Sequence, residues 1–266
     1  MLDLTATIVT FNSDFNKLAK TVETFNKCTL SKDLIIHDNS SDPDYREKLN
    51  NLHITKVLDG PNKGFGYGHN RAFEQCVESK YHLILNPDVE IPEGTLEKMI
   101  KFMELNPDVG LTSPKILNPD GSIQMLNKRD PSFFNLFARR FLPKSLQDWM
   151  PVKKRMDFYI MKDKGYESNY EVPYLSGCFM LFRTEIFKKL QGFDEKFFMY
   201  LEDADITRRS RLVCKCMYFS ETSIIHHWER GSYNSWKLTW ISIKSSFYYF
   251  WKWRCKKQNT NYRRLT

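Results

Sequence analysis

The sequence predicts an α/β fold in which a mixed, mainly parallel sheet is flanked by helices. Strand-like and helix-like segments alternate through the first half of the 266 residues. Repeated β–α units of this kind require parallel strands joined by crossover helices. The expected strands are also short apolar runs, which are typical of strands buried on both faces. The length allows one large α/β domain or two small ones, and it is long enough for a substantial core.

The elements follow in a regular order until residue 117. We expect strands at 4–10, 33–38, 54–59, 81–88 and 109–117, and helices after an N-cap at Ser13, at 66–79 and at 93–107. Later we expect a strand at 172–183, a helix at 185–193, an acid-rich helix opening near 202 and a short strand before 226. Between these halves, 129–171 has no clear period, which is typical of a functional insertion or a mobile lid.

Composition excludes several classes of protein. A hydrophobic content of 41% excludes wholesale disorder, and no apolar run approaches the roughly 18–20 residues of a membrane span. The first residues lack the basic region and cleavage site of a signal peptide. Six scattered cysteines lack the spacing of a zinc site, and we interpret them as reduced thiols of a cytosolic protein.

The net charge of +8 resides in the last residues of the chain. From Trp236 to Thr266 there are eight basic residues and no acid, so the remainder is balanced at 32 basic and 32 acidic residues. Such a tail is attracted to nucleic acid or to anionic lipid. Its helical spacing also creates an aromatic face that either packs on the domain or lies at a membrane interface. This face comprises Trp236, Trp240, Ile243, Phe247 and Phe250 or Trp251.

Polar clusters follow four of the expected strands. Turn chemistry alone places such residues after strands, but the carboxyl ends of parallel strands share one rim of a sheet, where ligands bind. The sequence therefore predicts a site on this rim. The clusters are Thr10–Asn12, Asp38–Asn39, Asn62–Gly64 and Asn86–Asp88.

Two of the expected segments carry groups suited to a metal and to proton transfer. Asn86-Pro87-Asp88 places a carboxylate beside an amide oxygen, which suits a hard divalent cation that also binds a diphosphate. Glu202, Asp203 and Asp205 open a helix, where the helix dipole favours acids. The aromatic approach "FFMYLED" would also bury their surroundings and raise a carboxyl pKa toward the range of a general base.

Histidines follow the last expected strand. His226 or His227 can ligate a metal, although either can also be an ordinary core residue. Arg230 and Ser232, a few residues later, can donate hydrogen bonds to phosphate oxygens.

Taken together, these segments resemble the family 2 glycosyltransferases of the GT-A (Rossmann-like) fold, in particular the bacterial rhamnosyltransferase-like branch. The resemblance runs from residue 5 to about 233. It is carried by "IVTFNS", "DNSSD", "NKGFGYGHNRA", "LNPDVEI", "YLSGCFMLFR", "GFDEKFFMYLEDADITRR" and "HHWERGS". It implies a catalytic domain at 1–235, with a nucleotide-sugar half at 1–113, an acceptor half at 114–235 and a basic helix and tail at 236–266.

The resemblance also implies roles for individual residues. Thr10 and Asn12 would border the base, and Asp38, beside Asn39, would bond a pyrimidine nitrogen. Asn62 to Gly68, including Gly64, and Arg71 would line the diphosphate. Asp88 would ligate Mg²⁺ or Mn²⁺, with Asn86 in place of the motif's first acid. Asp203 would be the catalytic base, with Glu202 as its acidic neighbour. His227 is the favoured histidine ligand, and His226 stays open.

The implied reaction is a direct displacement with inversion, from a nucleoside-diphosphate sugar to a hydroxyl of a glycan or polyprenyl-linked acceptor. Thymidine diphosphate rhamnose is the favoured donor, with uridine diphosphate hexoses as the alternative. The acceptors of this branch suit bacterial surface polysaccharide synthesis by a cytoplasmic enzyme peripheral on the inner face of the membrane, bound through its tail. The sequence gives no indication of an oligomeric state.

Two alternatives make different demands on the sequence. A sugar nucleotidyltransferase needs a basic glycine-rich loop after the first strand, and "TFNSDFNKL" contains no glycine. A nucleic-acid-binding protein would use the tail and lose affinity steeply with salt, but it gives no role to Asp88, Asp203 or His227. We therefore expect no nucleic-acid partner.

Overall fold

The structure is a computed structural model that describes residues 1–40, 42–228 and 236–256, with side chains through Arg254. Its strands are β1 (Leu2–Thr10), β2 (Lys32–Asp38), β3 (Lys56–Asp59), β4 (Ser79–Leu85), β5 (Val89–Glu90), β6 (Val109–Leu117), β7 (Tyr170–Glu171), β8 (Phe179–Arg183) and β9 (Lys215–His226). Its helices are α1 (Phe15–Asn26), α2 (Pro43–Asn50), α3 (Phe65–Phe73), α4 (Thr95–Leu105), α5 (Phe133–Phe141), α6 (Lys144–Gln147), α7 (Met150–Tyr159), α8 (Thr184–Lys189), α9 (Glu202–Ser210) and α10 (Trp236–Lys256), with a 3₁₀ turn η1 (Lys162–Lys164).

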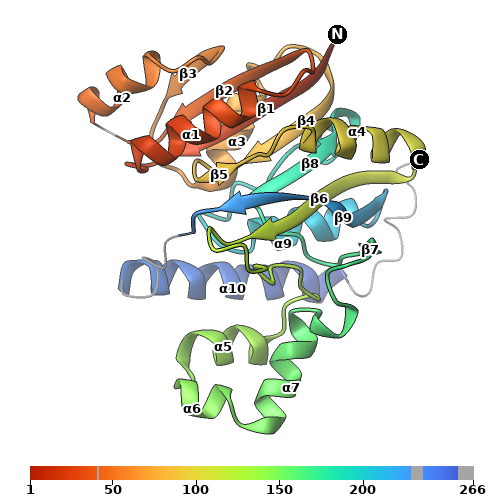
Figure 1. Cartoon of the computed structure of the whole chain (residues 1–266). Coiled ribbons are helices and arrows are strands. Elements are labelled where there is room, and N and C mark those ends of the chain that lie inside the picture. Colours follow the sequence, from red (N-terminus) through yellow and green to blue (C-terminus); the bar gives the residue numbers. More distant parts are fainter. Residues whose placement is uncertain (41, 229–235, 257–266) are drawn as a thin grey trace.

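One mixed sheet forms the centre of the molecule (Figure 1). Its order is β3-β2-β1-β4-β8-β6-β9-β5, and β7 pairs with β9. Strands β1, β2, β3 and β4 run parallel, while β8 runs antiparallel between β4 and β6. In this register Thr10 lies opposite Asp38, and Ile8 lies opposite Leu85. The carboxyl ends of β1, β2 and β4 therefore share one rim, and the predicted mixed sheet flanked by helices is confirmed.

Helices cover both faces of the sheet. Leu18 of α1, Leu49 of α2 and Met99 of α4 are buried in one core cluster with strand residues. The opposite core cluster contains Phe187 of α8 and Ile206 of α9, with Phe73 of α3 packed against it. Burial of strands on both sides explains why their sequences are almost continuously apolar.

Helix termini differ from the expectation in small ways. The N-cap of α1 is Asp14, not Ser13, because the Asp14 carboxylate accepts hydrogen bonds from the backbone N–H groups of Asn16 and Lys17. Helix α3 ends at Phe73, earlier than the predicted 66–79. Its successor, Glu74, is the C-cap.

The segment predicted to be irregular, 129–171, is mostly helical and contains α5, α6 and α7. Its helical period is hard to detect because α5 buries only Asn135 and Ala138. The aromatic stripe of this helix, Phe133, Phe137 and Phe141, is exposed instead. The usual pattern of apolar residues inside and polar residues outside is thus inverted on α5.

Helix α10 crosses beneath the sheet and lies between the sheet and the α5–α7 segment (Figure 1). It packs on the domain through Tyr249 and Trp253, which share a core cluster with Phe197 and Leu201. The aromatic face predicted from spacing is the opposite one. Trp236, Trp240, Phe247 and Trp251 on that face are exposed, because α10 carries aromatic residues on both sides. None of the helices among the described residues is long and apolar enough to cross a membrane.

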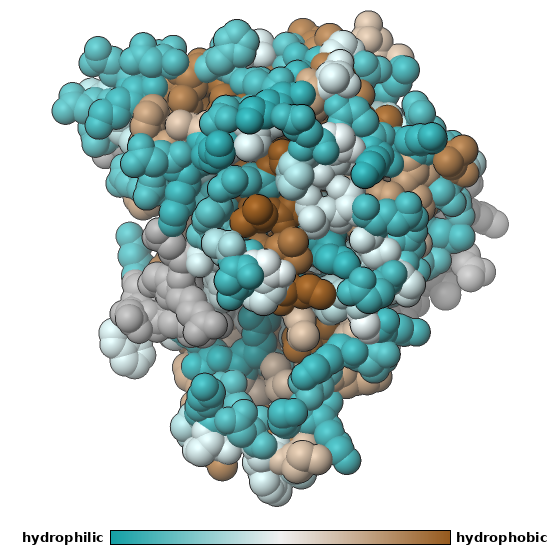
Figure 2. Space-filling model, in the orientation of Figure 1, coloured by the Kyte–Doolittle hydropathy of each residue, from teal (hydrophilic) through white to brown (hydrophobic). Residues whose placement is uncertain are grey.

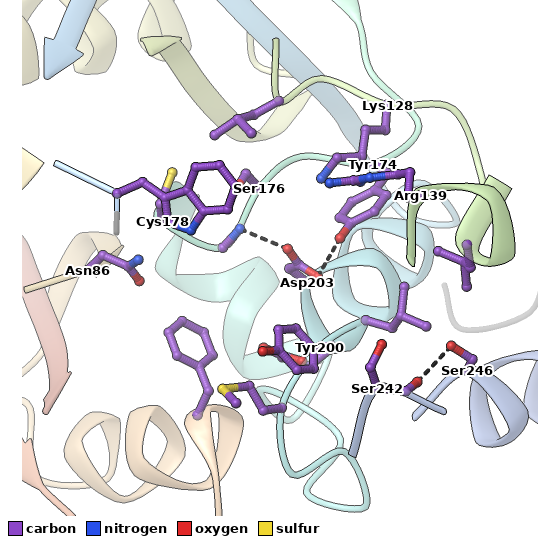
Figure 3. A pocket seen from close by; sticks show the side chains of 18 of the residues that line it. Asn86, Lys128, Arg139, Tyr174, Ser176, Cys178, Tyr200, Asp203, Ser242 and Ser246 are labelled. Atoms are coloured by element: carbon purple, nitrogen blue, oxygen red, sulfur yellow. Dashed lines mark hydrogen bonds between the residues drawn. The ribbon is translucent and has the colours of Figure 1, made fainter. Parts of the chain in front are cut away.

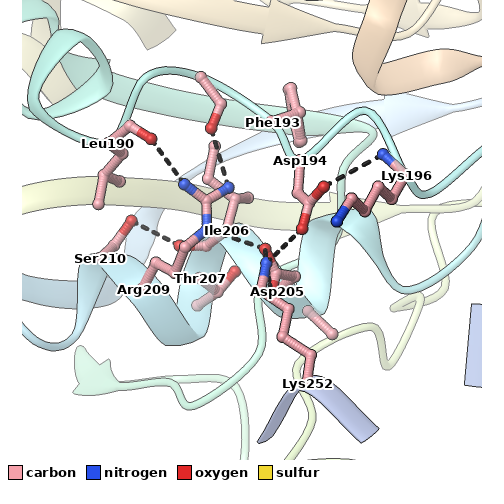
Figure 4. A network of polar contacts seen from close by, with 12 residues as sticks. Leu190, Phe193, Asp194, Lys196, Asp205, Ile206, Thr207, Arg209, Ser210 and Lys252 are labelled. Carbon is pink, nitrogen blue, oxygen red and sulfur yellow. Dashed lines mark hydrogen bonds and ion pairs between the residues drawn. The ribbon is translucent and has the colours of Figure 1, made fainter. Parts of the chain in front are cut away.

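A buried charge network holds α10 against α9 (Figure 4). Asp205, fully buried, accepts hydrogen bonds from Arg209 (2.8 Å), from Lys252 and from the indole N–H of Trp253 (3.0 Å). Lys252 also donates to Asp194 at 2.6 Å. Buried charges are tolerated when they are paired and hydrogen-bonded in this way. The network fixes the position of α9, whose first turn carries Glu202 and Asp203.

Candidate active site

A cavity of about 460 Å³ opens at the rim, between the sheet, α5, α9 and α10 (Figure 3). Asn86, after β4, lines one side of it, and Asp203, at the start of α9, lines its floor. Residues 86 and 203, far apart in the chain, therefore face a single cavity. The face drawn in Figure 2 is largely hydrophilic, with a strip of hydrophobic side chains down its middle.

The carboxylate of Asp203 is held by three donors. One oxygen accepts hydrogen bonds from the Tyr174 hydroxyl at 2.9 Å and from the Ala204 N–H at 2.9 Å. The other accepts from the Gly177 N–H at 3.1 Å. A Cβ on residue 177 would lie 3.3 Å from Cβ of Asp203, so glycine permits this close approach. The carboxylate is thus aimed at the cavity by fixed backbone and phenol donors.

Glu202 occupies a different environment from its neighbour. It is 6% exposed, and its Oε2 has no hydrogen-bond partner. Burial, followed by the charge of Asp203, raises the pKa of Glu202 well above its usual value. Burial thus acts on the carboxyl group of Glu202, the neighbour of the expected base, and favours its neutral form.

Asp88 and His226 face each other beside the cavity. Oδ1 of Asp88 and Nε2 of His226 are 3.4 Å apart, and both are buried atoms with no hydrogen-bond partner. The amide nitrogen of Gln124 donates to the His226 carbonyl oxygen at 2.7 Å, which leaves its amide oxygen 2.9 Å from Nδ1 of His226. Nδ1 is therefore a donor to Gln124, and Nε2 is the ring nitrogen on the side of the Asp88 carboxylate. A carboxylate oxygen and an imidazole nitrogen this close together are a suitable pair of ligands for a shared cation.

His227, the favoured metal ligand of the sequence analysis, lies elsewhere. Its Nε2 is 2.6 Å from Oε1 of Glu90, while its backbone N–H donates to the Asp88 carbonyl oxygen. Of the two open alternatives, the geometry favours His226 over His227. No cluster of three or more His, Cys, Asp or Glu side chains suited to a metal occurs in the described part of the chain. Asp88 and His226 nevertheless fit a divalent ion whose other ligands come from phosphate and water.

The first two strand ends meet as predicted. The hydroxyl of Thr10 donates to Asp38 at 3.0 Å, and the Asn39 N–H donates to the Thr10 carbonyl oxygen. Asp38 is fully buried and also accepts from Ser40. Because neighbouring strands are about 4.8 Å apart, Asp38 lies about 10 Å along the rim from the end of β4. That distance suits a ligand as long as a nucleotide.

The other residues expected to contact the nucleotide are not among those that line the cavity. Asn12 is exposed with φ of 50°, and Asn62 accepts a hydrogen bond from the Gly64 N–H at 3.2 Å. Gly64 has φ of 110°, and a Cβ there would lie 2.0 Å from the Phe198 carbonyl oxygen. Close packing against Phe198 therefore requires glycine at this position. Arg71 pairs with Glu195 at 2.9 Å and with Glu74 at 2.7 Å.

Two predicted phosphate donors, Arg230 and Ser232, lie outside the described residues. Four residues of the site were not identified from the sequence: Gln124, which orients His226, and Lys128, Arg139 and Tyr174 around Asp203. Arg139 belongs to the segment 129–171, which carried no clear period, and Lys128 immediately precedes it, so spacing gave no signal for either residue. Only the unusual density of basic residues near Arg139 and Arg140 distinguished this segment.

The sequence profile of Glycosyl transferase family 2 matches residues 5–191. The chain is 27% identical over 179 residues to N-acetylglucosaminyl-diphospho-decaprenol L-rhamnosyltransferase of Mycobacterium tuberculosis, which covers 63% of this chain and 57% of that protein. The chain thus spans little more than half of that relative. It is 26% identical over 258 residues to rhamnosyltransferase WbbL of Escherichia coli, with 94% and 93% of the two chains covered.

Solved structures with the same fold are more distant in sequence. GalNAc-T7 with UDP, GalNAc and Mn²⁺ superposes with a TM-score of 0.66 at 16% identity, covering 98% of this chain and 52% of that one. A mannosyltransferase of Pyrobaculum calidifontis with GDP-Man and Mn²⁺ gives 0.59 at 14% identity, covering 89% and 60%. The fold is that of the GT-A glycosyltransferases. The chain belongs to glycosyltransferase family 2 and resembles its rhamnosyltransferases.

We predict that Glu202→Gln stabilises the protein increasingly as the pH rises. The pKa of Glu202 is raised in the folded state, so its carboxyl group ionises in the unfolded chain, above pH 4.5, before it ionises in the folded protein. The wild type therefore loses stability as the pH rises, until the pKa of the folded state is reached. Each unit of such a rise corresponds to about 1.4 kcal/mol. Urea unfolding at several pH values measures this. An equal dependence of unfolding free energy on pH for Glu202→Gln and wild type would contradict this prediction. Glu185→Gln is the control, because Glu185 is exposed on α8.

Proposed function

We propose that this chain is an inverting glycosyltransferase that moves a sugar from a nucleoside diphosphate to a hydroxyl of a lipid-linked glycan. Rhamnose is the favoured sugar. The observation that carries the proposal is the shared cavity, in which Asp203 faces Asn86 and the Asp88–His226 pair lies alongside. Membership of family 2 supports the reaction type. The two rhamnosyltransferase relatives support the sugar, and the diphospho-decaprenol substrate in one relative's name supports the class of acceptor.

In the proposed mechanism Asp203 removes the proton of the acceptor hydroxyl. Its hydrogen bonds from Tyr174 and Gly177 orient the carboxylate, and the raised pKa of Glu202 favours the neutral form of that neighbour. The hydroxyl oxygen then attacks the anomeric carbon from the side opposite the leaving diphosphate. Positioned general bases of this kind typically contribute about 10²–10⁴-fold.

Donor binding is assigned to the rim of the sheet. Asp38 and Thr10 would contact the base, and the chain of strand ends from β2 through β1 to β4 leads toward the cavity. Asp88 and His226 would hold a divalent ion at the diphosphate, with Asn86 beside them. Such an ion neutralises the charge that develops on the departing diphosphate. Two solved structures of similar fold, one with UDP and Mn²⁺ and one with GDP-Man and Mn²⁺, support this placement.

We also propose that the enzyme binds anionic membranes peripherally. The outer face of α10 combines the exposed Trp236, Trp240, Phe247 and Trp251 with exposed Lys237, Lys244 and Arg254. At about 100° per residue, the four aromatic residues span only about 60° of the helix. A groove joins this face to α5, because Phe133 lines it together with Phe247 and Trp251. Aromatic residues and cations on one face are typical of interfacial helices.

The catalytic proposal predicts that Asp203→Asn lowers turnover by about 10²-fold or more and leaves nucleotide affinity within about twofold. The amide keeps the shape but cannot accept the proton. A panel of nucleotide sugars, with a lipid-linked glycan fraction as acceptor, identifies the donor first, and rate and calorimetry then compare the variants. Asp120→Asn, in an exposed loop, serves as control. An Asp203→Asn enzyme with wild-type turnover would refute the assignment.

The metal assignment predicts that Asp88→Ala and His226→Gln each lower nucleoside diphosphate affinity in Mn²⁺ by about tenfold or more. Without metal, the affinities of wild type and variants should converge, because the lost contact runs through the ion. His227→Gln should change the affinity by less than about twofold, since its side chain bonds Glu90. Calorimetry with and without Mn²⁺ decides, and the reverse order of the two histidine variants would restore His227 as the ligand.

The membrane proposal predicts that the double variant Trp240→Ser, Phe247→Ser floats with anionic vesicles several-fold less than the wild type. Deletion of 257–266 should also reduce it, because basic residues near such a surface contribute about 1 kcal/mol each. The deletion begins at 257 because Lys252 and Trp253 anchor α10 to the domain. Leu105→Ser, an exposed apolar residue on α4, is the control. Equal flotation of all four proteins would exclude this surface.

A further inference from the structure

Two residues shortly before Asp203 have an unfavourable backbone conformation. Tyr200 has φ of 71° and Leu201 has φ of 67°, so both lie in the left-handed region. This region is sterically unfavourable for residues with bulky side chains. Such conformations persist only where the surrounding structure holds them, and they cluster at active sites. The contacts that hold residues 199–201, the left-handed turn, therefore bear on the function of Asp203.

The left-handed turn forms part of the cavity wall. All three of its residues line the cavity, and Figure 3 shows Tyr200 beside the side chain of Asp203. The turn leads directly into α9, because Leu201 is the N-cap of this helix. A shift of the turn would therefore move the start of α9 and, with it, the carboxylate of Asp203.

On one side the turn is held by α3. The carbonyl oxygen of Phe198, the residue before the turn, accepts a hydrogen bond from the N–H of Phe65 at 3.0 Å. The start of α3 approaches this carbonyl group closely, since a Cβ on Gly64 would lie 2.0 Å from the same oxygen. The backbone that enters the turn is thus fixed by the first residues of α3.

On the other side the turn is held by α10. The hydroxyl of Ser245 donates to the carbonyl oxygen of Met199 at 2.8 Å. Ser245 is 5% exposed, and it shares one face of α10 with Tyr249 and Trp253 because the three residues recur at four-residue spacing. Leu201 belongs to the same core cluster as Tyr249 and Trp253. The hydrogen bond from Ser245 therefore fixes the turn where it packs on α10.

We propose that Ser245 is a positioning residue for the proposed reaction. Through Met199 it holds the left-handed turn, and the turn directs Asp203 toward the acceptor hydroxyl. This inference rests on the proposed function, in which Asp203 is the general base. A general base acts within hydrogen-bond reach of the proton that it removes, and a misplacement of about 1 Å can lower a rate about 10²-fold. Ser245 therefore affects turnover without touching the substrate.

The test compares Ser245→Ala with wild type in steady-state kinetics and in the exchange of backbone amide hydrogens. Without the hydroxyl, the carbonyl group of Met199 loses its donor and the turn relaxes. We expect kcat to fall about tenfold or more, because a displaced base slows the chemical step. The KM for the donor should stay within about twofold, because the donor is assigned to the strand ends. Amide hydrogens of residues 199–205 should exchange several-fold faster.

Three further variants separate positioning from a general loss of structure. Ser245→Thr keeps a hydroxyl and should retain most of the turnover. Ser245→Cys offers only a weak donor, so its kcat should lie between those of wild type and Ser245→Ala. It tests the inference even if Ser245→Ala does not fold. Ser210→Ala is the matched control, because this buried hydroxyl donates to Ile206 within α9, and its loss should leave kcat unchanged.

The outcomes distinguish this inference from the proposed function. Wild-type kcat and wild-type amide exchange in folded Ser245→Ala would overturn the inference, and loss of turnover in Asp203→Asn alone would leave the proposed function standing without it. A raised donor KM at unchanged kcat would also overturn it, because the turn would then serve the donor. If wild type uses no nucleotide sugar but exchange at the turn rises in Ser245→Ala, the proposed function fails and the positioning of the turn by Ser245 stands.

Discussion

The hydrogen bonds that hold Asp203 are the constraint on which the site depends. Tyr174 and Gly177 precede β8, whereas Asp203 opens α9, so the carboxylate joins two segments that border the same rim. The antiparallel insertion of β8 next to β4 makes this possible, because it brings the start of β8 beside the end of β4. The backbone N–H of Asn86 bonds the Cys178 carbonyl oxygen at 2.9 Å at this junction. The proposed donor and acceptor sides thus meet at one strand pair.

Helices from outside the sheet complete the cavity. Buried Asp205 ties α9 to Lys252 and Trp253 of α10, and Arg140 of α5 donates to Thr239 of α10. The positions of the turn that carries Asp203 and of the α5 side of the cavity therefore depend on the same helix. This explains why α10 must pack on the domain by one face. Its other aromatic face is left available for a surface such as a membrane.

The sequence predicted the strands well because most of them are buried on both sides and end in polar turns. It placed Asn86 and Asp88 on one rim of the sheet, and in the structure Asn86 lines the same cavity as Asp203. It could not distinguish His226 from His227, because that choice depends on Gln124, which is distant in sequence. It also missed the helices of 129–171, since α5 exposes its aromatic stripe. The sequence left open which way the aromatic face of α10 points, because aromatic residues occur on both sides of this helix, and the structure leaves that face exposed.

The central claim is that the donor's diphosphate end and the Asp203 carboxylate face one another in a single cavity. A crystal structure with Mn²⁺ and a nucleoside diphosphate tests this claim most directly. Anomalous scattering from the manganese should place the ion within bonding distance of Asp88 and His226, with the diphosphate between it and the cavity that Asp203 lines. Manganese and nucleotide at another surface, or an Asp203 carboxylate turned away from the diphosphate, would contradict the account.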